Sequence, residues 1–431
     1  MHLRSSIHGS LASAAVAAVA AVLLVLLAPL ARAGVILVDP GNDPNIALNT
    51  AILWAANGDT LILMPGGWTY PSQTFSPVTL EVSGKGLTII AAPGTHPELW
   101  TAYIRNVPAG SQFVLRGIDF KMHELAYLGT GGGAILVEDC AGAVWIEDSV
   151  ALAGDQAGSG TFLVSAPGWS GAAVRNCAAV SLVRCRLTGG KGADDFPSPL
   201  FPSPASPGGI GLGVGASNVT VHDCAMQGGT GGLGGSLSAG APSGPGIAVG
   251  SSSLLVVGSS AAGGNSTGVA PGDGLMSGGT SSVWLRDTVV TAGAGAGTAD
   301  DIDAAPGVVT LLTAPTRSLM LPASLHEAST GTMVIDGVQG DLVALFASPT
   351  GAVQFFPGKQ GAFLLASPLS ALFVLGPNPK PDGHWSINFG APALPAGVES
   401  VSVLLQLVVH DGTQVLFEGG SAVTILDSSL P

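Results

Sequence analysis

The sequence predicts an all-β protein in two parts, a stack of repeated short strands followed by a small β-sandwich. Three observations predict this fold class. One short pattern of residues occurs five times between Gly132 and Gly293. Within each copy, apolar residues alternate with other residues in the way that is typical of a half-buried strand. Beyond Ala314 the composition changes, and short apolar runs are separated by Gly, Pro and Asp turns.

The five copies occupy residues 143–154, 179–190, 218–229, 253–264 and 282–293. Equivalent positions in successive copies lie 29 to 39 residues apart. A period of roughly 20 to 50 residues is typical of a stacked array of repeats. This interval is longer than a bare coil of three short strands requires, so we expect the additional residues to form loops, which leave the stack after the Gly-rich end of each copy.

Two apolar side chains in each copy lie on one face of a short strand, because successive side chains of a strand point to opposite faces. These pairs are Val144 and Ile146, Val180 and Leu182, Val219 and Val221, Leu254 and Val256, and Val283 and Leu285. A single strand cannot bury this face alone. Successive copies must therefore stack and share one continuous core.

Each copy continues with a residue that tolerates a bend and then with a small residue. The first column is Asp148, Arg184, Asp223, Gly258 and Asp287, and the second is Ser149, Cys185, Cys224, Ser259 and Thr288. Asp and Gly accept bends that β-branched residues do not. We therefore interpret the first column as a corner of the stack and the second as the first inward position of the next strand.

This order of strand, corner, small residue, strand and Gly-rich turn resembles the right-handed parallel β-helix of pectin-lyase-like proteins, over roughly residues 35 to 314. The opening of the chain is similar to that of many members. Residues 45–57 resemble their amphipathic capping helix, and Gly58-Asp59-Thr60 resembles the turn before the first coil. The resemblance implies the fold. It implies no single activity, because this scaffold carries lyases, hydrolases, epimerases, adhesins and proteins without known chemistry.

Residues 1–33 are predicted to be a signal peptide. Arg4 precedes an apolar run from about Leu11 to Leu30, and Ala31-Arg32-Ala33 has the form of a cleavage site. An uncleaved membrane anchor is the alternative, since the run approaches the length that spans a bilayer. We expect an exported protein, periplasmic, extracellular or on the cell surface, with no membrane span after cleavage.

The charge of the chain excludes some partners. Cleavage after residue 33 removes Arg4 and Arg32 from the 14 basic residues, which leaves 12 against 28 acidic residues, a net charge of −16. A surface of this sign repels phosphate groups. We therefore expect neither nucleic acid nor an anionic membrane as a partner.

The predicted domains are the signal peptide (1–33), the β-helix with its capping helix (34–314) and the β-sandwich (315–431). Early strands of the β-helix are predicted at residues 60–64, 87–91 and 112–120. Those of the sandwich are predicted at residues 342–346, 352–356, 362–365, 372–374, 384–389, 400–409, 415–417 and 423–426. Turns at about ten-residue spacing are typical of a sandwich. Its end, residues 402–412 and 422–425, loosely resembles C-terminal modules of planctomycete-type secreted proteins.

The loop at residues 191–207 holds the candidate catalytic residues. It is rich in proline, so we expect a stiff, exposed flap that forms one wall of any groove. Asp194 and Asp195 are adjacent, and paired carboxylates act as acid and base on a glycosidic bond. Lys191 can take a proton beside a uronate. The alternative is solvated surface. The motifs of pectate lyases and polygalacturonases are otherwise missing, so the resemblance implies no catalytic role for these residues.

The four cysteines suggest one or two disulfides. Cys185 and Cys224 share the inward column of neighbouring coils, and Cys140 and Cys177 fall within one residue of a common column. Parallel strands lie about 4.8 Å apart, within the range that a disulfide spans. Our hypothesis is a Cys185–Cys224 disulfide. A stack of small buried thiols is the alternative.

We predict no cofactor and no metal. Asp300, Asp301 and Asp303 form an acidic cluster to which calcium is the conceivable ligand, but their spacing lacks the Gly and terminal Glu of an EF-hand loop, and an acidic turn is the alternative. Trp145 and Trp284 occupy equivalent outward positions, and with Trp169 they are the candidates for stacking on sugar rings. Packing beneath a loop is the alternative for these tryptophans.

Two functions follow as hypotheses. The first is an exported non-catalytic β-helix protein of the cell envelope or exterior, which is structural or binds a glycan or a surface protein. The second is a polysaccharide lyase or glycoside hydrolase that acts on an acidic polysaccharide through Asp194, Asp195 and Lys191. The repeats favour the first hypothesis, since reactive residues are few. The sequence leaves the ligand and the oligomeric state open.

Overall fold

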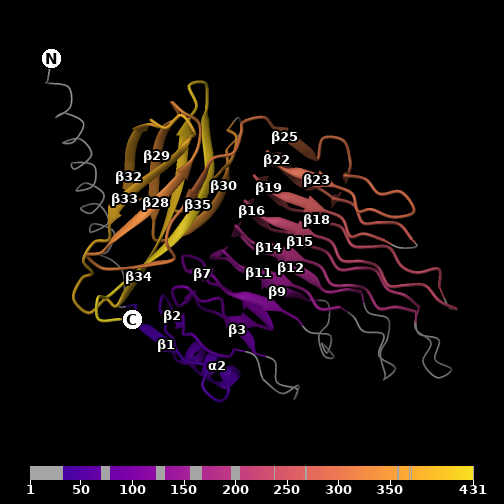
Figure 1. Cartoon of the computed structure of the whole chain (residues 1–431), viewed down its shortest axis with the longest axis horizontal. Coiled ribbons are helices and arrows are strands. Elements are labelled where there is room, and N and C mark those ends of the chain that lie inside the picture. Colours follow the sequence, from indigo (N-terminus) through magenta and orange to yellow (C-terminus); the bar gives the residue numbers. More distant parts are fainter. Residues whose placement is uncertain are drawn as a thin grey trace.

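The computed structural model is nearly all β, with one helix in the part of the chain that it describes (Figure 1). The described residues are 33–68, 78–122, 132–155, 167–195, 204–236, 238–266, 269–356, 359–367, 369 and 371–430. The predicted signal peptide therefore lies outside them except for its last residue. Among the described residues, no helix is long and apolar enough to cross a membrane.

Residues 35–312 form three parallel sheets, which we call the stack (Figure 1). The ten-stranded sheet contains, in spatial order, β1 (Val35–Val38), β2 (Thr60–Leu63), β4 (Thr88–Ala91), β7 (Gln112–Arg116), β10 (Ala143–Glu147), β13 (Ala179–Val183), β16 (Asn218–His222), β19 (Ser253–Val257), β22 (Ser282–Arg286) and β25 (Val309–Leu312). The eight-stranded sheet contains β3 (Thr79–Ser83), β6 (Thr101–Arg105), β9 (Gly133–Glu138), β12 (Ser170–Arg175), β15 (Leu212–Gly215), β18 (Ile247–Gly250), β21 (Leu275–Gly278) and β24 (Ile302–Ala304). The seven-stranded sheet contains β5 (Glu98–Leu99), β8 (Asp119–Lys121), β11 (Val150–Leu152), β14 (Arg186–Thr188), β17 (Ala225–Gln227), β20 (Ser260–Ala262) and β23 (Val289–Thr291).

Strands of successive copies pair in register, so equivalent residues form columns. Val144 lies beside Val180, which lies beside Val219, and the column continues through Leu254 to Val283. All five side chains are buried in one core that runs through the stack. Chain order and register together are consistent with a parallel β-helix. Each turn of the chain through the three sheets is called a rung below.

The first helix, α2 (Pro44–Trp54), starts where Asp43 accepts a hydrogen bond from the backbone N–H of Ile46 at 3.0 Å. Pro44 follows, and proline is well suited to the first turn because its missing N–H has no partner there. Leu48, Ala51 and Ile52 on its inner side are buried in the core of the stack. The predicted capping helix is present and covers the first rungs.

One predicted strand is divided by a corner. Residues 112–120 were expected as one strand, but the structure has β7 and β8 with Gly117 between them at φ +73°. This left-handed conformation suits glycine, which lacks a Cβ. The apolar run spans two sides of a rung because both sides face the same core.

Residues 318–426, the C-terminal part, form three further sheets. One contains β26 (Ser318–Met320), β28 (Thr330–Asp336) and β33 (His384–Gly390), and a two-stranded sheet contains β30 (Gly351–Phe355) and β31 (Ala362–Leu365). The five-stranded sheet contains β27 (Ser324–His326), β35 (Val415–Leu426), β34 (Ser400–His410), β29 (Leu342–Ser348) and β32 (Ala371–Pro377). The three-stranded and five-stranded sheets share one hydrophobic core. The two predicted strands at 415–417 and 423–426 are one strand, β35.

The C-terminal part lies on the outer face of the ten-stranded sheet (Figure 1). Apolar side chains of the two parts meet in one cluster that includes Trp145, Val183 and Leu255 from the stack, with Leu364 and Leu404 opposite. Hydrogen bonds add to this contact, such as that from Ser400 Oγ to Thr60 Oγ1 at 2.9 Å. Both faces of the ten-stranded sheet are therefore buried except at its end strands, which explains its near-continuous apolar strands.

Buried charges also join the two parts. Arg286 of β22 pairs with Glu418 of β35, and both side chains are fully buried. Glu147 of β10 pairs with Arg116 and Arg184 and also accepts a hydrogen bond from the backbone N–H of Ala422 at 2.8 Å. A buried ion pair is costly to break, because the remaining charge has lost its water. These pairs therefore fix the position of the C-terminal part on the stack.

The predicted Gly-rich loops are ordered in their described residues. Outgoing segments (189–195, 228–235, 263–266) leave after β14, β17 and β20, and returning segments (204–211, 241–246, 269–274) precede β15, β18 and β21. We call these six segments the glycine layers. They run side by side as extensions of the stack (Figure 1).

Hydrogen bonds in the glycine layers recur every third residue. Residues 189, 192 and 195 donate their N–H groups to the carbonyls of residues 227, 230 and 233, at 2.8 to 2.9 Å. Residues 206 and 209 of the returning segment donate to residues 193 and 190 of the outgoing one. Three residues per turn is the period of a polyproline II helix. Glycine is required at the contacts between layers, since a Cβ on Gly229 would lie 2.0 Å from the carbonyl oxygen of Gly190.

Candidate functional site

The corner column forms one wall of the candidate site. Asp148, Arg184, Asp223, Gly258 and Asp287 all have positive φ, between 48° and 59°. The predicted corner is thus confirmed. Asp and Gly tolerate the left-handed conformation better than most residues. Because the backbone turns at each of these positions, their side chains leave the stack and form a line along its axis.

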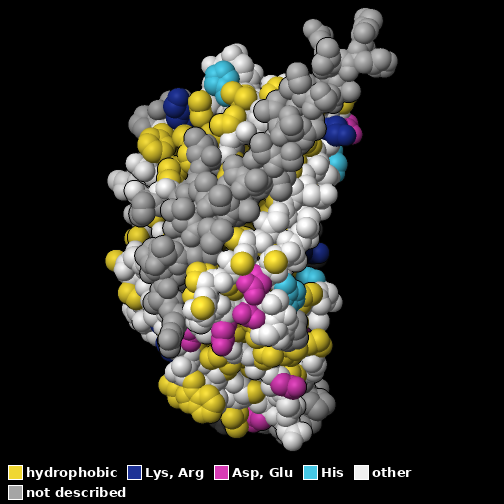
Figure 2. Space-filling model, turned by 90° about the vertical axis from the view of Figure 1, so that its left-hand side faces the viewer, with side chains coloured by type: hydrophobic (Ala, Val, Ile, Leu, Met, Phe, Trp, Pro, Cys, Tyr) yellow, Lys and Arg dark blue, Asp and Glu magenta, His cyan; other side chains and the backbone are white. Residues whose placement is uncertain are grey.

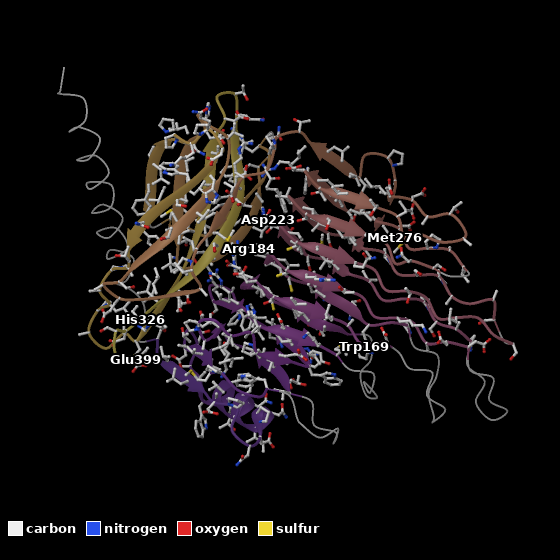
Figure 3. All side chains as sticks on the ribbon, viewed as in Figure 1. Trp169, Arg184, Asp223, Met276, His326 and Glu399 are labelled. Atoms are coloured by element: carbon white, nitrogen blue, oxygen red, sulfur yellow. The ribbon has the colours of Figure 1, made fainter. Side chains whose placement is uncertain are left out.

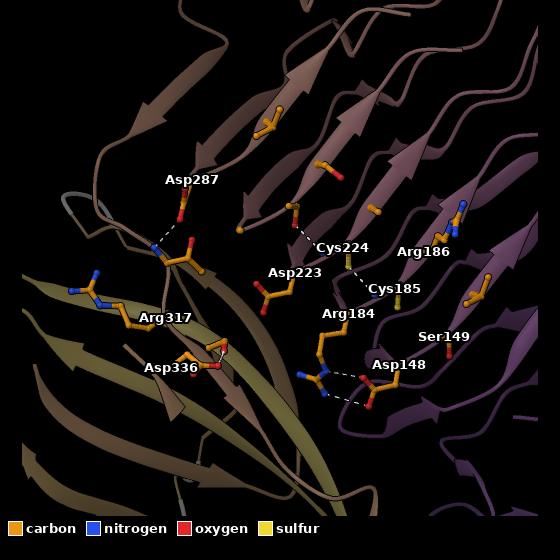
Figure 4. A pocket seen from close by; sticks show the side chains of 18 of the residues that line it. Asp148, Ser149, Arg184, Cys185, Arg186, Asp223, Cys224, Asp287, Arg317 and Asp336 are labelled. Carbon is orange, nitrogen blue, oxygen red and sulfur yellow. Dashed lines mark hydrogen bonds and ion pairs between the residues drawn. The ribbon is translucent and has the colours of Figure 1, made fainter. Parts of the chain in front are cut away.

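The C-terminal part forms the opposite wall, and between the walls lies a groove of about 1080 Å³ (Figure 4). The groove crosses five successive rungs, from Asp148 to Asp287. No Phe, Trp or Tyr lines it. The lining residues that we use below are Asp148, Arg184, Ala225, Asp223, Asp287, Arg317, Ser318 and Asp336.

The charges at the Asp148 end of the groove are neutralised by pairing. Arg184 Nε donates to Asp148 Oδ1 at 2.7 Å, and Arg116 Nε donates to Asp148 Oδ2 at 2.9 Å. Burial alone would raise the pKa of Asp148, but the bonds and charges of Arg184 and Arg116 lower it below its ordinary value. Asp148 is therefore a fixed anion that positions Arg184.

Asp223 differs from the other corner residues. The pKa of its carboxyl group is raised to about 6, chiefly by burial; the negative charges of Asp336 and Asp287 also raise it, and the positive charges of Arg184 and Arg286 lower it. Its carboxylate has no hydrogen-bond partner among the described residues. Figures 3 and 4 show Asp223 between the stack and the C-terminal part. This side chain is free to bind a ligand or to exchange a proton near neutral pH.

Gly258 keeps the space beside Asp223 open. A Cβ at this position would lie 2.6 Å from Asp223 Oδ1 and 2.9 Å from Thr316 Cγ2. The glycine also holds φ at +59°. Any side chain at residue 258 would displace the carboxylate, so the glycine serves both the corner and the groove.

Two further carboxylates face the groove and have partners on its opposite wall. Asp287 Oδ2 accepts a hydrogen bond from the backbone N–H of Thr316 at 3.2 Å. Asp336 contacts Ser318 Oγ at 3.3 Å and His384 Nδ1 at 2.7 Å. The facing basic groups Arg184 and Arg317 are each held by their own carboxylate partners. The groove is therefore polar and acidic at its centre, and it offers hydrogen-bond acceptors to hydroxyl or amino groups.

The predicted catalytic residues lie elsewhere, in the glycine layers. Lys191 Nζ pairs with Asp194 Oδ2 at 2.7 Å, and the other oxygen of Asp194 accepts from the N–H of Leu233 at 2.7 Å. Asp195 Oδ2 accepts from the N–H of Ser238 at 2.8 Å. The carboxylates thus hold neighbouring loops together. The described residues of this flap do not line the groove, and residues 196–203 of the flap lie outside the described part of the chain.

Two of the three tryptophans that were candidates for stacking on sugar rings are buried. Trp145 and Trp169 are 2% and 7% exposed. Trp145 and Trp284 share a column as predicted, but the C-terminal part covers that face. Trp145 Nε1 donates to Glu147 Oε2 at 2.7 Å, and Trp284 stacks on Phe355 with ring centroids 4.8 Å apart. Packing, which was the alternative, describes their role.

The disulfide hypothesis is also corrected, because all four cysteines are free and buried. The shared columns are present. The backbone N–H of Cys185 lies 3.2 Å from Cys224 Sγ, and the register of β9 with β12 places Cys140 beside Cys177. The thiols bond to backbone carbonyls, such as Cys224 Sγ to the carbonyl of His222 at 3.2 Å. They act as small residues in the crowded inner column, which was the alternative.

The acidic cluster at Asp300, Asp301 and Asp303 is exposed, and Asp301 Oδ1 accepts from the N–H of Ala292 at 2.7 Å. Among the described residues, no group of three His, Cys, Asp or Glu side chains gathers in a way that could hold a metal ion. The suggestion of calcium receives no support from this part of the chain.

Sequence reasoning placed Asp223 and Asp287 at a corner but gave them no further role. A usable signal was present, since a carboxylate recurs at the same position of the first, third and fifth copies. No pattern in the sequence indicated the opposite wall of the groove, because that wall is formed by residues far along the chain. A scan against protein-family models finds no match to this chain, and searches of the curated proteins and of the solved structures find none either.

Proposed function

We propose that this chain is an exported, non-catalytic scaffold that binds a glycan in the groove between the stack and the C-terminal part. The proposal includes a right-handed, pectin-lyase-like β-helix, a C-terminal β-sandwich and a cleaved signal peptide. One observation carries the function. A polar groove crosses five successive rungs and has a carboxylate in the corner of the first, third and fifth of them.

A groove of this kind suits an extended polymer. Adjacent parallel strands lie about 4.8 Å apart, so four steps between rungs give a length on the order of 19 Å. Hydroxyl groups of a polysaccharide offer donors along such a length. Asp223, Asp287 and Asp336 offer acceptors within it.

The charge of the groove selects the class of glycan. Five carboxylates line the groove (Asp119, Asp148, Asp223, Asp287 and Asp336) against three arginines (Arg184, Arg186 and Arg317), and two of these arginines, Arg184 and Arg317, are already paired. A polyuronate would bring further negative charge next to these carboxylates, which is unfavourable. The favoured ligand is therefore a neutral or amine-bearing polysaccharide. It replaces the acidic polysaccharide of the lyase or hydrolase hypothesis.

A second function is favoured by one specific observation, the raised pKa of Asp223. A carboxyl group with a pKa of about 6 is suited to donate a proton to a glycosidic oxygen, and a hydrolase needs a second carboxylate opposite it. Asp287 and Asp336 are the available partners. The second candidate is therefore a glycoside hydrolase with Asp223 as its acid.

The experiment that separates the two functions is a screen of the purified protein against neutral, amine-bearing and acidic polysaccharides. Retention on one of the first two classes, without new reducing ends or unsaturated products, is the expected result. Cleavage that Asp223→Asn abolishes would establish the hydrolase instead. Retention only on acidic polysaccharides, or on none, would contradict both proposals.

A further inference from the structure

The last rung of the stack is open. β23, β24 and β25 each lie at the end of their own sheet, with a neighbour on one side only. At the opposite end, α2 covers the first rungs. Unpaired strand edges are available to pair with another chain, and proteins usually cover them.

The core of the stack reaches solvent at this open end. Leu311 continues the inward column of Leu285, but Leu285 is 3% exposed and Leu311 is 68% exposed. Ile302 continues the column of Leu275, and its exposure rises from 0% to 36%. The register places these two residues in columns that are buried in the preceding rung. They are exposed because no further rung follows. Nothing in the described part of the chain covers them.

The helix at the other end is apolar on both sides. Leu48, Ala51 and Ile52 cover the first rungs, whereas Ile46, Leu53 and Trp54 are 63%, 74% and 77% exposed. Figure 2 shows hydrophobic side chains at the lower end of the molecule, where α2 lies in Figure 1. A helix that is apolar all round is typically buried. Among the described residues, none covers the outer side of α2.

We propose that copies of this chain associate head to tail, with the outer side of α2 in one copy on the open last rung of the next. The two uncovered surfaces lie at opposite ends of one axis, so a single kind of contact covers both. The same contact, helix on rung, already exists within the chain through the inner side of α2. A heterologous contact of this kind extends into a linear assembly unless it closes into a ring.

Charge favours this arrangement over the pairing of two open ends. Asp300, Asp301 and Asp303 are exposed beside the last rung, so two such ends would bring six carboxylates together. Like charges that face each other are unfavourable. The helix α2 has no charged residue within Pro44–Trp54, so it meets the acidic rim without this repulsion.

Sedimentation velocity over a range of protein concentrations tests the proposal. We expect the purified protein to form oligomers as its concentration rises. Two variants disrupt one surface each. The helix variant combines Leu53→Ser with Trp54→Ser, and the second variant carries Leu311→Asp on the last rung. Each should be monomeric. Val338→Asp changes a residue that is 46% exposed in the C-terminal part, and it should associate as the unchanged protein does.

Mixing the two variants is the decisive step. The helix variant keeps an intact last rung, and the Leu311→Asp variant keeps an intact helix, so together they should form a one-to-one dimer that cannot extend. The helix substitutions lie on the surface, so they keep the test valid if Leu311→Asp fails to fold. A protein that stays monomeric at all concentrations, or a helix variant that still associates, would overturn the proposal.

Discussion

At the scale of single residues, Asp223 determines the chemistry of the groove. Asp148 occupies the same column two rungs away, yet the pKa values of the two carboxyl groups move in opposite directions. Contacts with arginine lower the pKa of Asp148, whereas burial without a hydrogen-bond partner raises the pKa of Asp223. Equivalent positions in a repeat thus acquire different properties from their neighbours.

The raised pKa predicts how stability depends on pH. The pKa of Asp223 is about 6 in the folded chain against an ordinary value of 3.8, so the folded chain binds this proton more tightly than the unfolded chain. Stability should therefore fall as pH rises from about 4 to 6, by about 2 to 3 kcal/mol. Asp223→Asn should remove this dependence and stabilise the protein at neutral pH.

Thermal melting of Asp223→Asn at pH 4.5 and pH 7 checks this prediction, with Asp303→Asn, an exposed carboxylate, as the control. The difference between the two pH values should shrink only in Asp223→Asn. An equal shift in both variants would mean that Asp223 titrates normally.

A second residue-scale prediction concerns Arg286 and Glu418, which pair while fully buried. Arg286→Met leaves Glu418 without its partner, and removing one member of a buried pair typically costs about 3 to 5 kcal/mol. Replacing both, Arg286→Met with Glu418→Leu, should recover most of this loss in urea unfolding. If the double variant is as unstable as the single one, packing rather than charge explains the effect.

At the scale of elements, the stack was predictable and the glycine layers were not. Alternating apolar residues such as Val219 and Val221 indicate a strand locally, and Asp223 marks the corner that follows. The glycine layers carry no apolar alternation, so they were interpreted as loops. Their signal was the spacing of glycines, at 228, 229, 231, 232, 234 and 235 in one segment. The spacing indicates close packing of backbones only when it is known that a neighbouring segment lies in contact with these glycines. The sequence alone does not show this.

Because the glycine layers are closely packed, we expect one added methyl group to lower the stability of the protein strongly. Gly229→Ala would place a Cβ 2.0 Å from the Gly190 carbonyl oxygen, and relief of such a contact requires the backbone to shift, at a cost of roughly 1 to 3 kcal/mol. Gly215→Ala is the matched control, because a Cβ there meets nothing within 4 Å. Urea unfolding should show a loss for Gly229→Ala alone. Equal stability of the two variants would mean that the layers are loosely packed.

At the scale of the whole molecule, the groove exists because the C-terminal part returns onto the stack. Thr316 and Asp336 reach the corner column only through this contact, and the pairing of residues so distant in sequence has no local signal. The same contact buries Trp145, for which the sequence left stacking on sugar and packing both open. The candidate site was missed for the same reason, because no local pattern shows which distant residues cover this face of the stack.

We propose the groove as the place where a glycan binds. Ala225 is an exposed small residue of the groove lining, so Ala225→Trp should fill the groove without disturbing the core. Ala239 is exposed between two segments of the glycine layers and does not line the groove, so Ala239→Trp is the control.

The most direct measurement is the retention of these two variants and the unchanged protein on the polysaccharide that the screen identifies. We predict that Ala225→Trp loses retention at least tenfold, whereas Ala239→Trp is retained like the unchanged protein. A tenfold loss corresponds to about 1.4 kcal/mol of binding free energy. Unchanged retention of Ala225→Trp would contradict the account and place the ligand on another surface.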